Sequence, residues 1–265
     1  MKTLLFLFVS LTASVASAAI VQKAIPYEHD GVKLEGVLLY DDALTAAGPR
    51  PGVLLIHEWW GLNDFPIEQA RRLAQEGYVA FALDMYGQGV STRDAKEAGA
   101  LAGEFYGQPL MATRARAGLD QLLATGLVDE QRVAAIGFCF GGSTAMALAY
   151  SGAPLAGMVS FHGGPIPASA EAAKRNQAKF LVCHGAVDPL VPKEQLDRFL
   201  LSLDEGGIDY QFIAYAGAVH AFTNPSADKF AALNHLEGVK YQRAAAERSW
   251  RHMLDFFGEI FAERR

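Results

Sequence analysis

The sequence of 265 residues predicts an α/β protein whose doubly wound, mostly parallel β-sheet is entered by an N-terminal antiparallel hairpin. Short continuous apolar runs alternate with stretches of helical character, which is typical of a parallel sheet that helices cover on both faces. Near the start, the turn dipeptide Asp30-Gly31 separates two strand candidates, which is typical of a hairpin. No low-complexity linker or internal repeat divides the chain, so we expect one domain over residues 19–265.

The predicted elements follow one another along the chain in a regular way. The hairpin strands are expected at residues 25–27 and 33–40, on either side of the turn. The later strands are expected where apolar runs are continuous, at residues 52–57, 78–83, 132–136, 157–161, 179–183 and 210–215. Helices are expected between them, at residues 66–76, 93–105, 109–123 and 143–150, then between the last strands, and finally at 239–261.

The composition excludes several classes of protein. With 51% hydrophobic and 20% charged residues, the chain is neither disordered nor collagen-like, and two cysteines are too few for a disulfide-stapled fold. The net charge of −6 gives no electrostatic reason to bind nucleic acid or an anionic membrane. We therefore expect neither of these partners.

Residues 1–18 resemble a secretory signal peptide. Lys2 supplies a positive start, residues 4–15 are mostly apolar, and Ala16-Ser17-Ala18 offers a small-x-small cleavage site. The alternatives are a buried N-terminal helix or a membrane anchor, but the run is short for a span of about 20 residues. We expect cleavage after Ala18 and a mature protein in the periplasm or outside the cell.

A candidate nucleophile lies directly after the strand expected at 132–136. The sequence Gly137-Phe138-Cys139-Phe140-Gly141 has the spacing of a nucleophile elbow, G-x-S-x-G, with cysteine in place of serine. Small residues on both sides allow the tight turn between strand and helix. The alternative is a buried structural cysteine between two glycines that pack closely.

A base and an orienting acid are expected at two further strand ends. Asp188 follows the strand at 179–183, and His220 follows the strand at 210–215. The order Cys139, Asp188, His220 is that of the α/β-hydrolase triad. Each residue alone has another interpretation: Asp188 as a turn residue before proline, and His220 as a loop histidine. However, ligands and catalytic groups of such sheets lie at the carboxyl ends of the strands, where both residues are expected.

These residues, together with His57-Glu58-Trp59-Trp60-Gly61-Leu62, resemble the dienelactone hydrolase (carboxymethylenebutenolidase) family. The resemblance runs from about Gly31 to the C-terminal helix and implies the α/β-hydrolase fold. It also implies roles: Cys139 attacks a carbonyl, His220 acts as general base and acid, and Asp188 orients the imidazole.

The same resemblance implies two further parts of the site. Glu58 corresponds to the family glutamate that interacts with the resting thiol and participates in its activation. The backbone N–H groups of Trp59 and Phe140 are implied to form the oxyanion hole. A solvated loop carboxylate is the alternative interpretation of Glu58.

The sequence departs from the family pattern where two arginines hold the free carboxylate of dienelactone. Gln88 and Asn224 stand at these positions, and neither can form the bidentate charged pair of arginine with a carboxylate. Dienelactone is therefore doubtful as the substrate. Arg93 is a candidate replacement that spacing alone does not decide.

We expect an apolar or aromatic substrate pocket beside these residues and no metal or cofactor. His162 and His184 follow neighbouring strands, but no set of side chains with zinc spacing and no phosphate or dinucleotide loop is present. The predicted pocket residues are Trp60, Tyr86, Gln88, His162, Phe222 and Asn224.

The sequence thus predicts an exported hydrolase that cleaves small ester, lactone or thioester bonds through an acyl-cysteine. Amides suit thiolate attack less well. The alternatives are a non-catalytic small-molecule-binding protein on the same fold and a thiol redox protein, although no C-x-x-C sequence supports the second. In the implied fold Cys139 and Cys183 end strands two positions apart, about 10 Å, so we expect no disulfide between them. The oligomeric state is not predicted.

Overall fold

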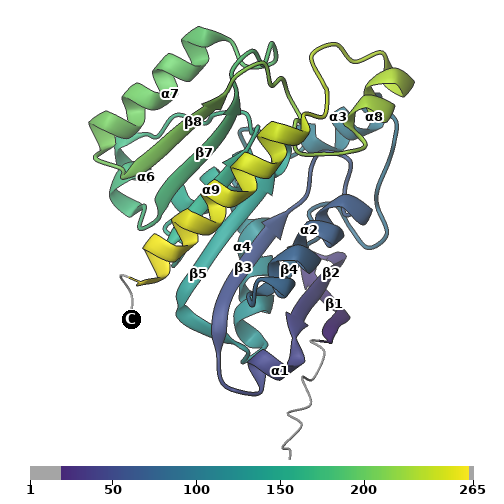
Figure 1. The fold of residues 1–265 in the computed structure, drawn as a ribbon, viewed down its shortest axis with the longest axis vertical. Coiled ribbons are helices and arrows are strands. Elements are labelled where there is room, and N and C mark those ends of the chain that lie inside the picture. The colour runs from purple at the N-terminus through teal and green to yellow at the C-terminus, as the bar shows by residue number, and fades with distance from the viewer. Residues whose placement is uncertain (1–18, 263–265) are drawn as a thin grey trace, which may run out of the picture.

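The computed structural model describes residues 19–262, and the predicted signal peptide at 1–18 lies outside them. An eight-stranded sheet forms the centre, with the strand order β1-β2-β4-β3-β5-β6-β7-β8 (Figure 1). The predicted fold class is confirmed. The strands are β1 Ile20–His29, β2 Val32–Asp41, β3 Arg50–Ile56, β4 Val79–Leu83, β5 Val128–Phe138, β6 Gly157–Phe161, β7 Lys179–Gly185 and β8 Tyr210–Tyr215.

The hairpin forms at the predicted turn. Asp30 and Gly31 both have positive φ, 52° and 74°, which a two-residue hairpin turn of this handedness requires. Strand β2 then pairs antiparallel with β4, whereas β3 to β8 are parallel. The carboxyl ends of β3 to β8 therefore meet at one edge of the sheet, where ligands of this architecture bind.

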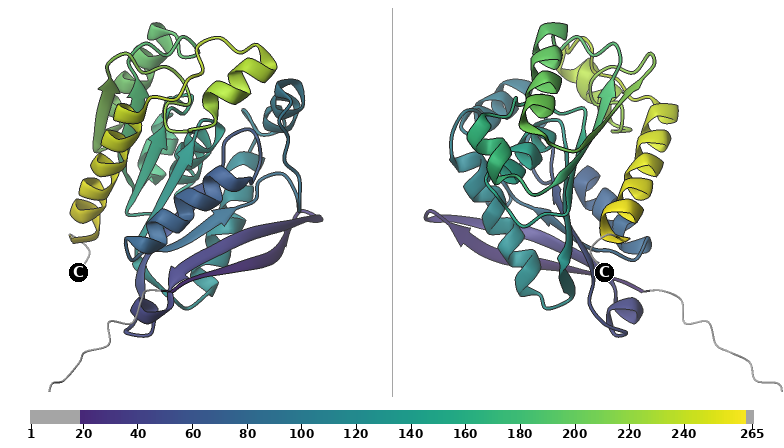
Figure 2. Two further views of the ribbon diagram at one scale, coloured as in Figure 1. Left: turned by 45° about the vertical axis from the view of Figure 1, so that its right-hand side comes forward. Right: turned by 90° about the vertical axis from the view of Figure 1, so that its left-hand side faces the viewer.

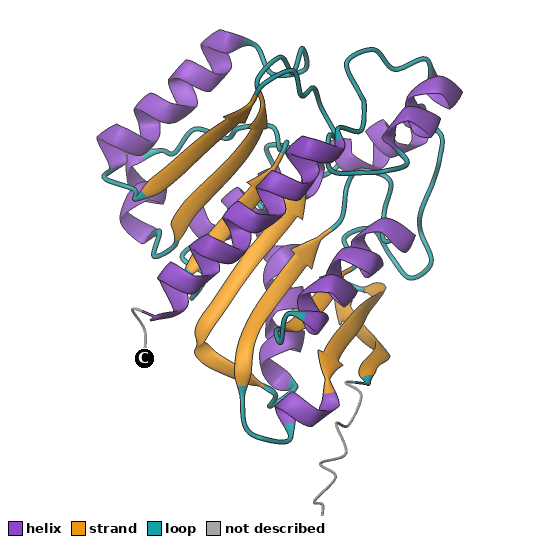
Figure 3. Cartoon of the chain, viewed as in Figure 1, coloured by secondary structure: helices purple, strands orange, loops and turns teal. Residues whose placement is uncertain are grey.

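Helices cover both faces of the sheet, as Figures 2 and 3 show. On one face α2 and α9 contribute to a core with the alternate side chains of the central strands. On the other face α4, α5, α6 and α7 contribute to a second core. The helices are α1 Asp42–Thr45, α2 Asp64–Gln75, α3 Ala95–Gly103, α4 Leu110–Ala124, α5 Phe140–Tyr150, α6 Ala170–Arg175, α7 Lys193–Gly206, α8 Ala227–Asn234 and α9 Arg243–Ala262.

The predicted element bounds differ from the structure near both ends of the chain, and strand β1 begins at Ile20, five residues before its expected start. The last helix begins at Arg243 instead of residue 239, because Val239 forms a β-bridge beside His220. The preceding helix α8 and the short helix α1 were not predicted. Strand β5 begins earlier than expected, at Val128, because its first residues pair with the start of β3. None of the described helices has the length and apolarity to cross a bilayer.

Candidate active site

The turn from β5 into α5 holds Cys139 in a strained conformation, with φ 53° and ψ −117°. Non-glycine residues rarely adopt positive φ, and such strain concentrates at functional sites. The turn is possible because its neighbours lack a Cβ: one added at Gly137 would meet the Gly141 carbonyl, and one at Gly141 would meet the Ile56 carbonyl. Cys139 is partly exposed at the N-terminus of α5, where the helix dipole favours negative charge.

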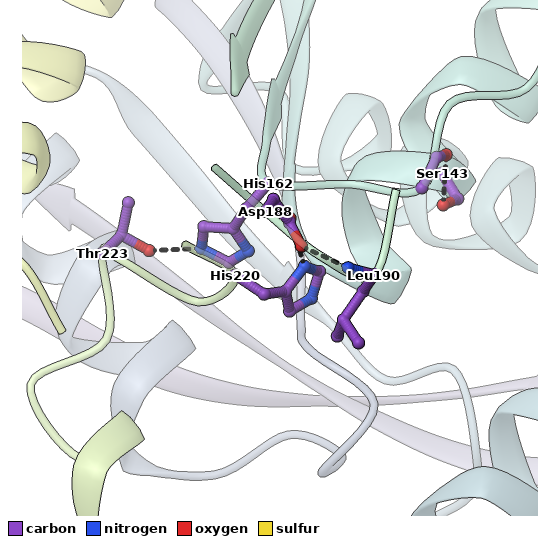
Figure 4. A network of polar contacts seen from close by, with 7 residues as sticks. Ser143, His162, Asp188, Leu190, His220 and Thr223 are labelled. Atoms are coloured by element: carbon purple, nitrogen blue, oxygen red, sulfur yellow. Dashed lines mark hydrogen bonds and ion pairs between the residues drawn. The ribbon is translucent and has the colours of Figure 1, made fainter. Parts of the chain in front are cut away.

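Asp188 and His220 meet although they are 32 positions apart in the chain (Figure 4), and His220 lines the same cavity as Cys139. The Nδ1–H group of His220 donates to Asp188 Oδ2 at 2.9 Å. The other carboxylate oxygen accepts from the backbone N–H of Leu190, also at 2.9 Å. Because the Asp188 side chain is fully buried, these two hydrogen bonds fix the imidazole in one orientation.

The imidazole of His220 and the thiol of Cys139 line the same cavity. Burial alone lowers the pKa of His220, but the negative charge of a Cys139 thiolate and the hydrogen-bonded Asp188 outweigh burial and raise it to about 10. An imidazolium is therefore favoured at neutral pH. The arrangement can supply both a nucleophile and a proton donor.

Glu58 lies buried in the loop after β3 and lines the same cavity as Cys139 and His220. Burial raises its pKa to about 7, against the opposing effects of a hydrogen bond from Asn224 and the charge of His220. The amide Nδ2 of Asn224 donates to Glu58 Oε2 at 2.6 Å. Asn224, which stands at one of the two arginine positions of the family pattern, thus holds the carboxyl group of Glu58.

The raised pKa of Glu58 predicts a stability difference that depends on pH. Its native pKa of about 7 exceeds the usual unfolded value, so the native state binds more protons between these values and its stability falls as pH rises through them. Glu58→Gln cannot ionise and still accepts from Asn224. We expect its free energy of unfolding, relative to wild type, to increase by about 2–3 kcal/mol from pH 5 to pH 8. Urea unfolding at both pH values measures this, and an unchanged difference would contradict the buried, proton-binding carboxyl.

The loop that carries Glu58 is fixed by side chains behind it. The buried ring of His57 accepts at Nε2 from the Met85 N–H (3.2 Å), so its Nδ1–H donates to the Glu58 carbonyl (2.5 Å). Burial lowers the pKa of His57, in agreement with this neutral form. The Tyr86 hydroxyl donates to the Trp59 carbonyl at 3.1 Å.

The two backbone N–H groups expected at an oxyanion hole are available. Within residues 19–262 neither the N–H of Trp59 nor that of Phe140 has a hydrogen-bond acceptor. Phe140 is the first residue of α5, so its N–H has no partner within the helix. Both groups can therefore donate to a ligand oxygen.

A cavity of about 320 Å³ opens beside Cys139. Most of its wall is apolar, and half of the wall comes from residues that the sequence did not indicate. The lining residues are Glu58, Trp59, Trp60, Cys139, Leu190, His220, Ala221, Leu236, Glu237 and Val239. The lining residues at 236–239 belong to the segment after α8. Hydrogen bonds between this segment and His220 hold it beside the cavity. No local sequence pattern predicts this tertiary contact.

Of the six predicted pocket residues, only Trp60 is among those that line the cavity. Trp60 lines the cavity, whereas Gln88 is exposed and donates to Glu35 Oε2 at 3.0 Å, so its assignment to the pocket is corrected. Tyr86 and Asn224 do not line the cavity. Each donates a hydrogen bond to a residue that does, Tyr86 to Trp59 and Asn224 to Glu58. Their polar groups are engaged by the protein instead of facing the cavity.

His162 and Phe222 do not line the cavity either. Both are buried, and the ring of His162 packs against those of His220 and Phe222. The two rings of His162 and His220 are 5.3 Å apart, and those of His162 and Phe222 are 5.2 Å apart. His162 Nε2 is hydrogen-bonded to the Thr223 hydroxyl at 2.7 Å (Figure 4). Burial, with the charge of His220, holds the pKa of His162 well below its usual range, so this ring is a neutral packing partner.

His184 contacts Phe212 and lines a different cavity from that of Cys139. Across residues 19–262 no three His, Cys, Asp or Glu side chains come together as a metal site. Cys139 and Cys183 are both free thiols, on strand ends that β6 separates.

Comparisons with known proteins agree with this fold. The model of the "Dienelactone hydrolase family" matches residues 37–261. Among solved structures, a dienelactone hydrolase-like promiscuous phosphotriesterase from metagenomic libraries is 39% identical with a TM-score of 0.86, covering 92% of this chain and 99% of its own. A protein named m3DLH is 40% identical with the same TM-score, covering 91% and 99%. Protein usf of Aquifex pyrophilus is 28% identical over 242 residues, which are 89% of this chain and 97% of that protein.

Proposed function

The chain belongs to the dienelactone hydrolase family, and from this premise we propose that it cleaves small ester, lactone or thioester bonds with Cys139 as nucleophile. The observation that carries the proposal is that Cys139 lines the same cavity as His220, whose imidazole Asp188 orients at 2.9 Å. A nucleophile and a base in one cavity, with an acid that orients the base, are what covalent acyl transfer requires. The family membership makes the chain a hydrolase; the bond and the nucleophile are our proposal.

The reaction proceeds in two steps. The Cys139 thiolate attacks the carbonyl carbon, and the oxygen that becomes negative accepts hydrogen bonds from the N–H groups of Trp59 and Phe140. The C–O bond to the alcohol breaks as the imidazolium of His220 donates its proton to the leaving oxygen, which leaves a thioester on Cys139. Water then loses a proton to His220 and attacks the thioester. The C–S bond breaks and releases the carboxylic acid.

A second candidate is phosphotriester hydrolysis. It is favoured by the 39% identity, over 92% of this chain, with the promiscuous phosphotriesterase. The same thiolate would attack phosphorus, form an S–P bond and displace an aryl oxide, and water would then break the S–P bond. The apolar wall of the cavity suits an uncharged triester.

A substrate panel tests both candidates. It contains 4-nitrophenyl acetate and butyrate, a short-chain lactone, an acyl thioester and diethyl 4-nitrophenyl phosphate. We expect turnover of at least one member and, after rapid quenching, an acyl or phosphoryl mass on Cys139. Binding without turnover or adduct would favour the non-catalytic alternative. Reversible oxidation of Cys139 coupled to a dithiol, without hydrolysis, would favour the redox alternative.

We also propose that residues 1–18 direct export and are removed after Ala18. The positive start, the apolar run and the small residues before the cut support this proposal. The intact mass of the protein from the periplasmic fraction of an expressing bacterium measures it. A mass that includes residues 1–18 would contradict cleavage.

A further inference from the structure

The charged side chains that line the cavity beside Cys139 are mainly acidic, and His220 is the basic group among them. The apolar wall of the cavity holds two carboxylates, Glu58 and Glu237, and within residues 19–262 no lysine or arginine lines it. The pKa of Glu58 is raised to about 7 by burial, so this group is part ionised near neutral pH. The imidazolium of His220 is paired with the carboxylate of Asp188 at 2.9 Å, so the two glutamates leave the cavity with a net negative potential.

Glu237 is held at this place by the backbone on both sides of it. The His220 N–H donates to the Gly238 carbonyl at 3.0 Å, and the Lys240 N–H donates to the His220 carbonyl at 3.1 Å. Gly238 has a φ of 73°, and a Cβ there would meet the ring of Pro189. These bonds fix the backbone of Glu237 beside His220, while its side chain is exposed and borders the cavity.

The arginine and lysine side chains of a neighbouring cleft do not line this cavity. Arg93 and Lys229 line that cleft, which has a volume of about 470 Å³. The stacked rings of Trp60 and Phe230, 4.7 Å apart, stand between the two, because Trp60 lines the cavity and Phe230 lines the cleft. The amide of Asn224 is already bonded to Glu58.

We propose that Glu237 is a specificity-determining residue, which makes the cavity selective for uncharged or cationic substrates and discriminates against those with a free carboxylate. The inference rests on the proposed function, since it assumes that Cys139 is the nucleophile. It deepens that function by naming the charge class of the substrate. It predicts that the acyl groups cleaved by this chain carry no carboxylate close to the scissile bond.

Alkylation of Cys139 tests the inference without requiring turnover. Iodoacetamide and iodoacetate differ in an amide against a carboxylate, and each forms an S–C bond as iodide leaves. At low ionic strength we expect the ratio of their rate constants, amide over carboxylate, to fall by about three- to tenfold in Glu237→Gln and further in Glu237→Lys. The control Glu205→Gln removes the same charge from an exposed position in α7 and should leave the ratio unchanged. Mass spectrometry assigns the label to Cys139.

Ester hydrolysis provides the second measurement. The methyl 4-nitrophenyl diester of glutaric acid and the 4-nitrophenyl hemiester differ only in a terminal methyl ester against a carboxylate. We expect the wild type to prefer the diester by about tenfold or more in kcat/KM, and Glu237→Gln to reduce this preference.

Two results would overturn the inference. The first is an alkylation ratio in Glu237→Gln equal to that of Glu205→Gln. The second is a wild-type preference for the hemiester that disappears in Arg93→Gln, because the neighbouring cleft would then recognise the anion. Either result would leave the proposed hydrolysis by Cys139 intact. Absence of both turnover and adduct across the substrate panel would instead contradict the proposed function. In that case the alkylation ratios would still measure the effect of the Glu237 charge.

Discussion

Replacing Cys139 by alanine is expected to lower kcat/KM for the best substrate of the panel by at least about 10³-fold. The variant loses the proposed nucleophile, while His220, Asp188 and the two backbone N–H groups remain. Residual rate would come from binding and from the oxyanion donors. Rapid-quench mass spectrometry should show no acyl adduct in this variant.

Cys183→Ala is the matched control for this loss. Cys183 is fully buried at the end of β7, and burial raises its pKa to about 12, so its thiol is inert at neutral pH. We expect this variant to keep its turnover and its adduct on Cys139. Equal activity of Cys139→Ala and wild type, with both variants folded by circular dichroism, would exclude the acyl-cysteine mechanism.

Adding one methyl group at Gly137 is expected to cost about 4 kcal/mol or more in the free energy of unfolding. The new Cβ would overlap the backbone carbonyl of Gly141, which cannot move without opening the contact of α5 with β5. Because the collision is with backbone and not with a flexible side chain, the turn that presents Cys139 has to distort. Loss of soluble protein, or a large fall in the urea midpoint, is the expected result.

Gly258→Ala is the control for the effect of the methyl group itself. Gly258 lies within α9, and a Cβ there meets no atom within 4 Å. Alanine is the better helix former, so this variant should gain about 0.5–1 kcal/mol. If Gly137→Ala were as stable as Gly258→Ala, close approach at the turn would not be what requires glycine.

The position of Cys139, Asp188 and His220 at one edge of the sheet follows from the chain itself. Each residue follows the end of a strand within a few residues, and parallel strands bring their carboxyl ends together. The local signals are strong here because strand, turn and helix are contiguous in sequence. This is why the three side chains, up to 81 positions apart in the chain, were expected at one edge of the sheet. In the structure Asp188 bonds to His220, and His220 lines one cavity with Cys139.

The wall of the cavity was not predictable in the same way. Asn224 was expected beside the substrate, but it bonds to Glu58 across 166 residues. Glu237 and Val239 carry no motif, and Val239 was assigned to the last helix. Their places depend on α8 and on how the segment after it folds back along His220, which is a matter of packing between distant segments.

The sequence by itself determined the fold class, the hairpin, the elbow and the order of the three strand-end residues, because periodicity and turn chemistry act over a few neighbouring residues. The tertiary structure decided which groups face the cavity and with what charge: Gln88 lies outside, Asn224 holds Glu58, and Glu237 lies at the wall. Side-chain environment is set by contacts between segments far apart in the chain, and a one-dimensional pattern does not contain those contacts.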